Sequence, residues 1–175
     1  MSKFRLCLAG VALALAGAVP AGATILGPDA ALCARGEGPA ILVNVVGFKS
    51  RAGTVRARTF GGDPSKWFDK RYYLKRTLAD VPSAGPVSIC MPVPRPGVYA
   101  VDIRHDINNS QDSGRADGAG ASGNPEVSLW DIIFKRKPPA NKVGVQVGPG
   151  LTTITVVLKY VSGGSLKPVA MTSSR

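Results

Sequence analysis

Hydrophobic and polar side chains alternate along two neighbouring segments of the chain, which is the pattern of half-buried β-strands. Residues 40–48 (AILVNVVGF) are apolar and rich in β-branched side chains, and residues 54–60 (TVRARTF) follow a short glycine-containing loop. Two such segments joined by a short loop predict a β-hairpin. Because strand side chains alternate between two faces, Arg56 and Arg58 point away from the apolar side chains of their strand. The second strand therefore predicts one basic, solvent-facing surface.

Four later segments also have strand character, with glycine- and proline-containing turns between them. They are a short strand whose prolines suit an edge or strand-end position, a strongly alternating strand, and the two strands of a final hairpin: 86–93, 98–105, 142–147 and 151–161. Residues 126–134 are apolar and predict either a short helix or a strand. The strands are short and close together, which is typical of all-β domains.

One short helix is predicted between the strands. Asp63 and Pro64 have the residue types of an N-cap and a first helical position, so a helix is expected to begin there and to run to about Lys70. Trp67 and Phe68 are expected to dock this helix on the sheet.

These elements predict a mainly all-β fold. We expect an antiparallel β-sandwich, Ig-like or transthyretin-like, of about seven strands with one or two short helices, over residues 40–161. Residues 24–39 are expected to form an irregular leader held mainly by Cys33. Residues 162–175 have few core-forming side chains and are expected to form a flexible C-terminal tail.

The N-terminal segment has the order of a cleavable secretory signal peptide over residues 1–23. Lys3 and Arg5 precede an uncharged stretch from 6 to 19, and an A-x-A triplet follows at 21–23. The stretch is shorter than the roughly 20 residues that span a membrane, which favours cleavage over a permanent N-terminal anchor. We therefore expect a periplasmic or extracellular protein with no transmembrane segment after cleavage.

Charge narrows the expected partners. The formal net charge of +11 falls to +9 when the two basic residues of the signal peptide are removed. Basic residues concentrate between 49 and 76, and four of them form a candidate anion-binding face: Arg56, Arg58, Lys70 and Arg71. Such a face could attract an anionic cell-envelope surface, although solvated charges that keep the domain soluble explain the same pattern. Nucleic acid is not an expected partner outside the cell, and another protein pairing with an exposed strand edge stays open.

The three cysteines indicate one disulfide. Cys7 leaves with the signal peptide, and Cys33 and Cys90 are the natural partners in an oxidising compartment. The alternative, a redox-active or nucleophilic thiol, has no C-x-x-C spacing behind it.

The order of several motifs resembles a known family. Residues 96–108 read P-G-x-Y-A-V-x-I-x-H-D-x-N, residues 117–124 read D-G-x-G-x-S-x-N, and T-T-I-T-V closes the pattern at 152–156. Together with the Gly-Phe end of the first strand, these features are similar to the bacterial domain-of-unknown-function family 2141 over about residues 40–160. The resemblance implies a small secreted β-sandwich protein and supplies no reaction.

The segment from 106 to 124 is glycine-rich and is expected to be a long exposed loop. It begins with oxygen-bearing side chains at every second position, which is a pattern that could supply ligands to calcium: Asp106, Asn108, Ser110 and Asp112. The family resemblance implies D-x-N-x-N-G here, and this chain departs from it at Ser110 and Gln111. The alternative is a turn whose polar side chains bond to their own backbone.

No catalytic set is apparent. His105 is the single histidine, too few for a zinc site of the usual kind, and a histidine bonded to the neighbouring loop is the simpler interpretation. No residue pattern identifies a nucleophile for a triad. Two hypotheses remain: an exported, non-enzymatic binding or structural module without a cofactor, or a calcium-binding or hydrolytic protein centred on residues 105–112.

Overall fold

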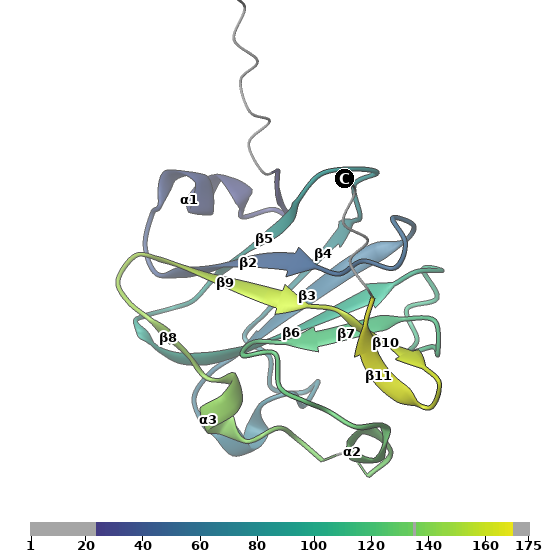
Figure 1. Ribbon diagram of the computed structural model, residues 1–175. Helices are drawn as coiled ribbons and strands as arrows, with labels where there is room; N and C mark the ends of the chain where they lie inside the picture. The colour runs from purple at the N-terminus through teal and green to yellow at the C-terminus, as the bar shows by residue number, and fades with distance from the viewer. Residues whose placement is uncertain (1–23, 135, 170–175) are drawn as a thin grey trace, which may run out of the picture.

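The computed structural model describes residues 24–134 and 136–169. The predicted signal peptide at 1–23 lies outside these residues. Two β-sheets pack face to face (Figure 1). The predicted β-sandwich is confirmed. None of the helices in the described part of the chain has the length and apolar character needed to cross a membrane.

The first sheet has the order β1-β5-β2-β9. Its strands are β1 (Ile25–Leu26), β2 (Ala40–Val46), β5 (Val87–Pro92) and β9 (Leu151–Val157). β2 lies in the middle, antiparallel to β5 and parallel to β9. The sandwich is therefore mixed rather than purely antiparallel. The prolines of β5 were expected at a sheet edge or at a strand end. Pro92 is the last residue of β5, and β1 pairs in parallel with the other side of β5.

The second sheet has the order β11-β10-β7-β6-β3-β4, and β8 pairs separately with the start of β6. Its strands are β3 (Thr54–Phe60), β4 (Lys75–Asp80), β6 (Gly97–Asp106), β7 (Gly118–Ala121), β8 (Val145–Val147), β10 (Lys159–Ser162) and β11 (Ser165–Pro168). The described residues thus form eleven strands instead of about seven, because short pairings were not visible as separate alternating runs. β7 also shortens the expected loop at 106–124.

The main core fills the space between the two sheets. Alternate residues of β2 and β5 point inward and meet alternate residues of β3 and β6, so that Ile41, Ile89, Val55 and Val101 are fully buried. Burying each such aliphatic side chain stabilises the fold by about 1.5–3 kcal/mol before entropy is counted. The period-2 patterns found in the sequence are therefore the inner faces of the sandwich.

Both predicted hairpins are wrong. β2 and β3 lie in different sheets, and the loop between them crosses the end of the sandwich, where Gly47 and Gly53 have positive φ. A Cβ on Gly53 would lie 2.0 Å from the backbone oxygen of Asp106, so only glycine allows this close approach. β8 and β9 also pair with different strands. Two alternating segments can share one face or oppose each other across a core, and the alternation is the same in both cases.

The segments at both ends of the domain are more ordered than expected. Residues 24–39 contain β1 and the helix α1 (Ala30–Arg35), and the disulfide between Cys33 and Cys90 attaches α1 to β5. The predicted disulfide is present. The prediction that residues 24–39 are irregular is wrong, because they contain a strand and a helix. β11 pairs with β10 inside the segment expected to be a flexible tail. Both additions cover sheet edges, and their sequences are too short to show alternation.

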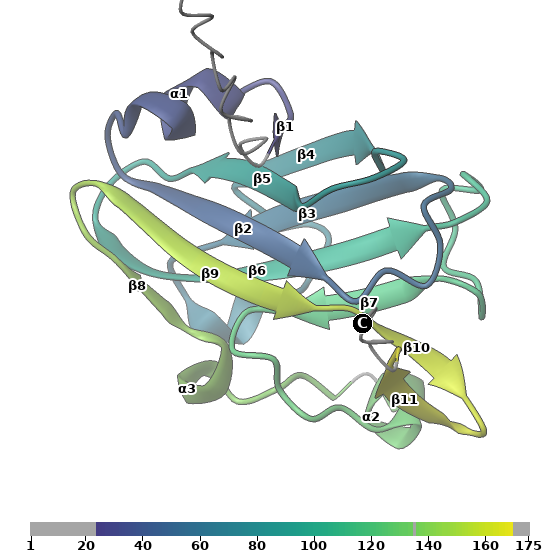
Figure 2. The same ribbon diagram turned by 45° about the horizontal axis from the view of Figure 1, so that its top comes forward.

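Short helices lie beyond the second sheet, on the side away from the first (Figures 1 and 2). They are the 3-10 helix η1 (Pro64–Lys66), α2 (Leu129–Ile133) and α3 (Ala140–Val143). The carboxylate of Asp63 accepts a hydrogen bond from the Ser65 amide, as an N-cap does. The helix ends before Trp67, earlier than predicted, and Trp67 packs with Phe60 and Val143 in a second, smaller core. Residues 126–134, for which either a helix or a strand was expected, contain the helix α2.

Candidate functional site

The register of β3 and β6 gathers charged side chains on the outer face of the second sheet. Arg56 pairs with Arg104 and Arg58 pairs with Asp102 in directly opposite positions. Residues opposite each other in an antiparallel pair point to the same side, so three arginines and one aspartate share a small area. Two arginines directly opposite each other repel, and this arrangement requires anions nearby.

Asp102 accepts hydrogen bonds from only one of the two neighbouring arginines of β3. Its carboxylate accepts a hydrogen bond from Arg58 Nε at 3.0 Å and a second one from the Arg58 Nη2 group. Arg56 Nη2 lies 3.9 Å from the same carboxylate and forms no hydrogen bond with it. The forked geometry of the first pair uses both carboxylate oxygens. Arg58 therefore forms a hydrogen-bonded ion pair with Asp102, whereas Arg56 forms only a longer ion pair with the same carboxylate.

Arg56 is a partly desolvated cation with unused donors. Its side chain is 20% exposed, and its Nε is buried without a hydrogen-bond partner among the described residues. Burial lowers the pKa of Arg56 below the ordinary value of an arginine, while the neighbouring Asp102 partly opposes this change. A buried donor without an acceptor costs free energy. The Nη groups of Arg56 form no hydrogen bond among the described residues, and an anion in the groove can accept from these groups.

Three segments outside the strands form the walls of a groove over this part of the sheet: 68–70, 111–113, and 131 with 136–138. The groove has a volume of about 720 Å³, and Phe68 and Pro138 are among the residues that line it. Lys137 donates a hydrogen bond to the backbone oxygen of Ser65, which joins one wall to the other. Six basic and three acidic residues line the groove: Arg56, Arg58, Lys70, Arg104, Arg136 and Lys137, with Asp69, Asp112 and Asp131. The groove is therefore a basic hollow of a size that fits a small anion or a polymer segment.

The loop after β6 is organised around the guanidinium of Arg104. Arg104 Nη2 lies 3.2 Å from a carboxylate oxygen of Asp106 and 3.3 Å from one of Asp117. The guanidinium also donates to the backbone oxygens of Gln111 and Asp112. A cation of the protein itself thus lies among the oxygens that the sequence suggested for calcium.

The four candidate calcium ligands form a turn that bonds to its own backbone. Asp106 accepts hydrogen bonds from the Ser110 and Gln111 amides, at 3.1 and 2.8 Å, and Asn108 accepts one from the Ser110 amide at 3.3 Å. The Ser110 hydroxyl donates to the backbone oxygen of Asp112. Gln111 has φ 63°, the left-handed conformation for which the family pattern has glycine. In the described part of the chain, no three His, Cys, Asp or Glu side chains converge as metal ligands.

The family model of uncharacterized proteins conserved in bacteria, DUF2141, matches residues 43–155. The chain belongs to this family. The match runs from β2 to β9 and includes the arginines and the aspartate of the outer face. No curated protein and no solved structure matches the chain.

His105, within the DUF2141 region, is a structural histidine. It is fully buried between the sheets, and its Nε2 lies 2.8 Å from the Ala52 carbonyl oxygen. Because a carbonyl only accepts, Nε2 donates and Nδ1 accepts from the Tyr160 hydroxyl at 2.7 Å. His105 was expected to bond to the loop that follows it, but its partners lie in the corner between β2 and β3 and in β10. With both nitrogens used in the core, His105 is not placed for acid–base chemistry at the surface.

The structure brings together three of the four residues predicted as an anion-binding face of the DUF2141 domain. Arg56, Arg58 and Lys70 line the groove, whereas Arg71 is exposed and pairs with Asp69, whose pKa this arginine lowers. The face is also less solvated than expected, since the Arg58 side chain is only 12% exposed.

Sequence reasoning missed three basic residues of the groove, which are Arg104, Arg136 and Lys137. A signal existed for each of them. Arg104 alternates with buried residues of β6, and the other two belong to the basic run that ends the α2 segment. Only the register of β3 on β6 and the fold of the later loop show that they meet.

Proposed function

We propose that this protein is an exported, non-enzymatic binding module that holds anionic groups of the cell envelope in the groove on the outer face of its second sheet. The observation that carries this proposal is the guanidinium of Arg56, which is largely buried, carries no hydrogen bond to the carboxylate beside it, and opens onto a hollow lined by five further cations. A bound phosphate or carboxylate would accept from the free donors of Arg56.

Long-range attraction supports the same function. The net charge of the chain is strongly positive, and the groove concentrates part of that excess between two walls. A concave basic surface with low-dielectric walls focuses its field on the solvent and speeds the approach of anions. The interaction is expected to weaken as salt rises, because the Debye length falls from about 10 Å at 0.1 M to about 3 Å at 1 M.

The expected compartment supplies suitable partners. The N-terminal segment has the pattern of a secretory signal, and a disulfide joins α1 to β5, as is common in oxidising compartments. The polyanions of such compartments are lipid head groups and envelope polymers rather than nucleic acids.

Calorimetric titration with inorganic polyphosphate tests the proposal. We expect Arg56→Gln to weaken binding at least tenfold, since a hydrogen bond to a charged group contributes about 1.5–3 kcal/mol. Binding is also expected to fall between 50 and 500 mM NaCl.

Arg35→Gln is the matched control, because it removes the same charge from α1, beside the other sheet, where Arg35 pairs with Glu37. Equal affinities of the two variants would show that net charge alone governs binding, and would overturn the proposal of a groove site. Absence of binding by the wild-type protein at low salt would also overturn it.

A further inference from the structure

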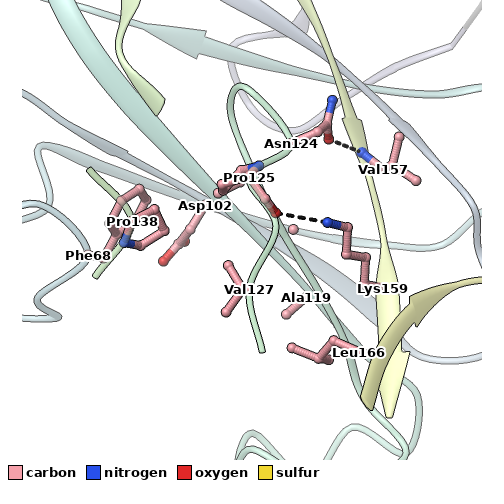
Figure 3. Close-up of a pocket in the computed structure, with 12 residues that line it drawn as sticks. Phe68, Asp102, Ala119, Asn124, Pro125, Val127, Pro138, Val157, Lys159 and Leu166 are labelled. Carbon is pink, nitrogen blue, oxygen red and sulfur yellow. Dashed lines mark hydrogen bonds between the residues drawn. The ribbon is translucent and has the colours of Figure 1, made fainter. Parts of the chain in front are cut away.

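An apolar pocket of about 190 Å³ lies on the same face of the second sheet, beside β7. Figure 3 shows Phe68 and Pro138 on one side of it and Val127, Ala119 and Leu166 on the other. Nine of the twelve residues that line this pocket are apolar, and the exceptions are Asp102, Asn124 and Lys159. The pocket exceeds the roughly 150 Å³ of engineered cavities that bind benzene, so it can hold a short alkyl chain or one ring.

The sequence of β7 explains why the pocket exists. Its inward positions, Gly118 and Gly120, have no side chain, and a Cβ on Gly118 would lie 2.5 Å from the ring of Tyr160. Ala119 and Ala121 pair with the outward residues of β6, so they also point outward. As alanines, they carry only methyl groups. Larger side chains from the flanking segments rise around this strip of small residues and leave a hollow above it.

Hydrogen bonds fix the wall of the pocket before any ligand arrives. Asn124 accepts from the Val157 amide at 2.8 Å, and Lys159 donates to the Pro125 carbonyl at 2.8 Å (Figure 3). Asn124 also donates to the Thr155 carbonyl at 2.9 Å. These bonds hold the segment after β7 against β9 and β10. A preformed wall reduces the entropy that a ligand must offset on binding.

The apolar pocket and the basic groove are neighbours with a shared wall. Phe68 and Pro138 line both of them. Asp102 lines the pocket, and the Arg58 that binds its carboxylate lines the groove. A single molecule can therefore place an apolar part in one hollow and a charged part in the other.

We infer that the site binds an amphiphilic anion, a molecule with a short alkyl or aryl portion in the pocket and a phosphate- or carboxylate-type group in the groove. This inference rests on the proposed function of the groove and adds the class of ligand. The charged group of a cationic amphiphile would be repelled by the six basic side chains that line the groove. An uncharged amphiphile would leave the hydrogen-bond donors of Arg56 unused. An anion with an apolar tail satisfies both hollows.

Titration with octyl phosphate, kept below its critical micelle concentration, tests the inference against inorganic phosphate. Each methylene that leaves water strengthens binding about fourfold, so we expect octyl phosphate to bind at least tenfold more tightly than phosphate. Ala121→Leu fills the pocket and is expected to remove this gain while it leaves the affinity for phosphate unchanged. Arg56→Gln is expected to weaken the binding of both compounds.

Ala84→Leu is the matched control, because Ala84 is exposed in a turn outside the pocket. Ala119→Leu fills the same pocket from the neighbouring outward position, and it replaces Ala121→Leu if that variant does not fold. Equal binding of phosphate and octyl phosphate by the wild-type protein would overturn the inference and leave the groove function standing.

Two other results also overturn the inference. One is unchanged octyl phosphate binding in the pocket-filling variants. The other is binding to vesicles of phosphatidylglycerol without affinity for monomeric octyl phosphate, which would indicate a surface that recognises bilayers.

Discussion

At the scale of single residues, the Tyr160 hydroxyl connects three parts of the sandwich. It accepts a hydrogen bond from the Lys49 amide at 3.2 Å, at the corner after β2, and donates to Nδ1 of His105 on β6. The ring is 3% exposed, and it stands edge-on to the histidine. Burial raises the pKa of Tyr160 above its ordinary value of 10.0, because the phenolate is poorly solvated there.

We expect Tyr160→Phe to lower the free energy of unfolding by about 2 kcal/mol at pH 8, because two buried polar groups lose their partner. The difference from wild type is expected to shrink at high pH. A folded-state pKa above the unfolded value means that the stabilisation is complete below about pH 10 and is lost as the pH rises through the folded-state pKa. Urea unfolding at pH 8 and at pH 11 measures both quantities.

Tyr72→Phe is the control for this experiment, since Tyr72 is 43% exposed. Its effect is expected to stay within about 0.5 kcal/mol at either pH. A constant difference between wild type and Tyr160→Phe over this range would show that the hydroxyl titrates as it does in water, contrary to the effect of burial.

At the scale of elements, the loop between β6 and β7 depends on a cation supplied by β6. The Arg104 side chain is 11% exposed, and the Asp106 and Asp117 carboxylates on either side of it are 8% and 7% exposed. Without this guanidinium two carboxylates would stay buried close together. The conformation of the loop is thus linked to the strand that precedes it.

We expect Arg104→Gln to lower the free energy of unfolding by about 3 kcal/mol, because removing one partner of a buried ion pair leaves uncompensated charge. Chemical denaturation measures this loss. Arg115→Gln, in the exposed part of the same loop, is expected to change stability by less than about 0.5 kcal/mol.

Thermal unfolding with and without 1 mM calcium tests whether calcium is a ligand of this loop. Because Arg104 occupies the space among the carboxylates, the melting temperature of the wild-type protein is expected to be the same with and without calcium. A rise of several degrees, abolished by Asp106→Ala, would contradict this account and return the loop to the calcium hypothesis.

At the scale of the whole molecule, one covalent link joins the N-terminal segment to the sandwich. Cys33 and Cys90 are 57 residues apart in the sequence, and both are buried beside Ala40. Chain-entropy arguments predict that closing a loop of this length stabilises the fold by about 4 kcal/mol.

We expect the double substitution Cys33→Ser with Cys90→Ser to lower the free energy of unfolding by about 4 kcal/mol relative to the oxidised protein. Urea unfolding with and without a reducing agent measures the change. The reduced wild-type protein is expected to match the double variant. A variant as stable as the oxidised protein would show that α1 and β1 hold the segment without the bond.

The sequence predicted the faces of the strands better than their partners. Val55 and Ala57 point inward and Arg56 and Arg58 outward, as the alternation required. The hairpin predicted from the sequence was wrong, because Gly47 and Gly53 permit a hairpin turn and a corner between sheets equally well. Alternation reports which side of a strand is buried, and it carries no information about which strand lies beside it.

The candidate site shows the same division. Arg56, Arg58 and Lys70 were predicted from local charge density, and all three line the groove. Arg104 could not be predicted as a groove residue, because its place opposite Arg56 depends on a pairing between strands distant in the sequence. The apolar pocket left no signal, since two outward alanines become a hollow only when larger side chains surround them.

The parallel pairing of β2 with β9 has a kinetic consequence. β2 begins at Ala40 and its partner β9 at Leu151. The middle strand of the first sheet therefore cannot complete its pairing until almost the whole domain is available. Domains dominated by such distant contacts fold in milliseconds to seconds, because loop closure costs entropy before any contact compensates for it. During synthesis, β2 has an unpaired backbone edge until β9 emerges. Such an edge is a template for intermolecular pairing, so the nascent chain is most vulnerable to aggregation just before its last strands appear.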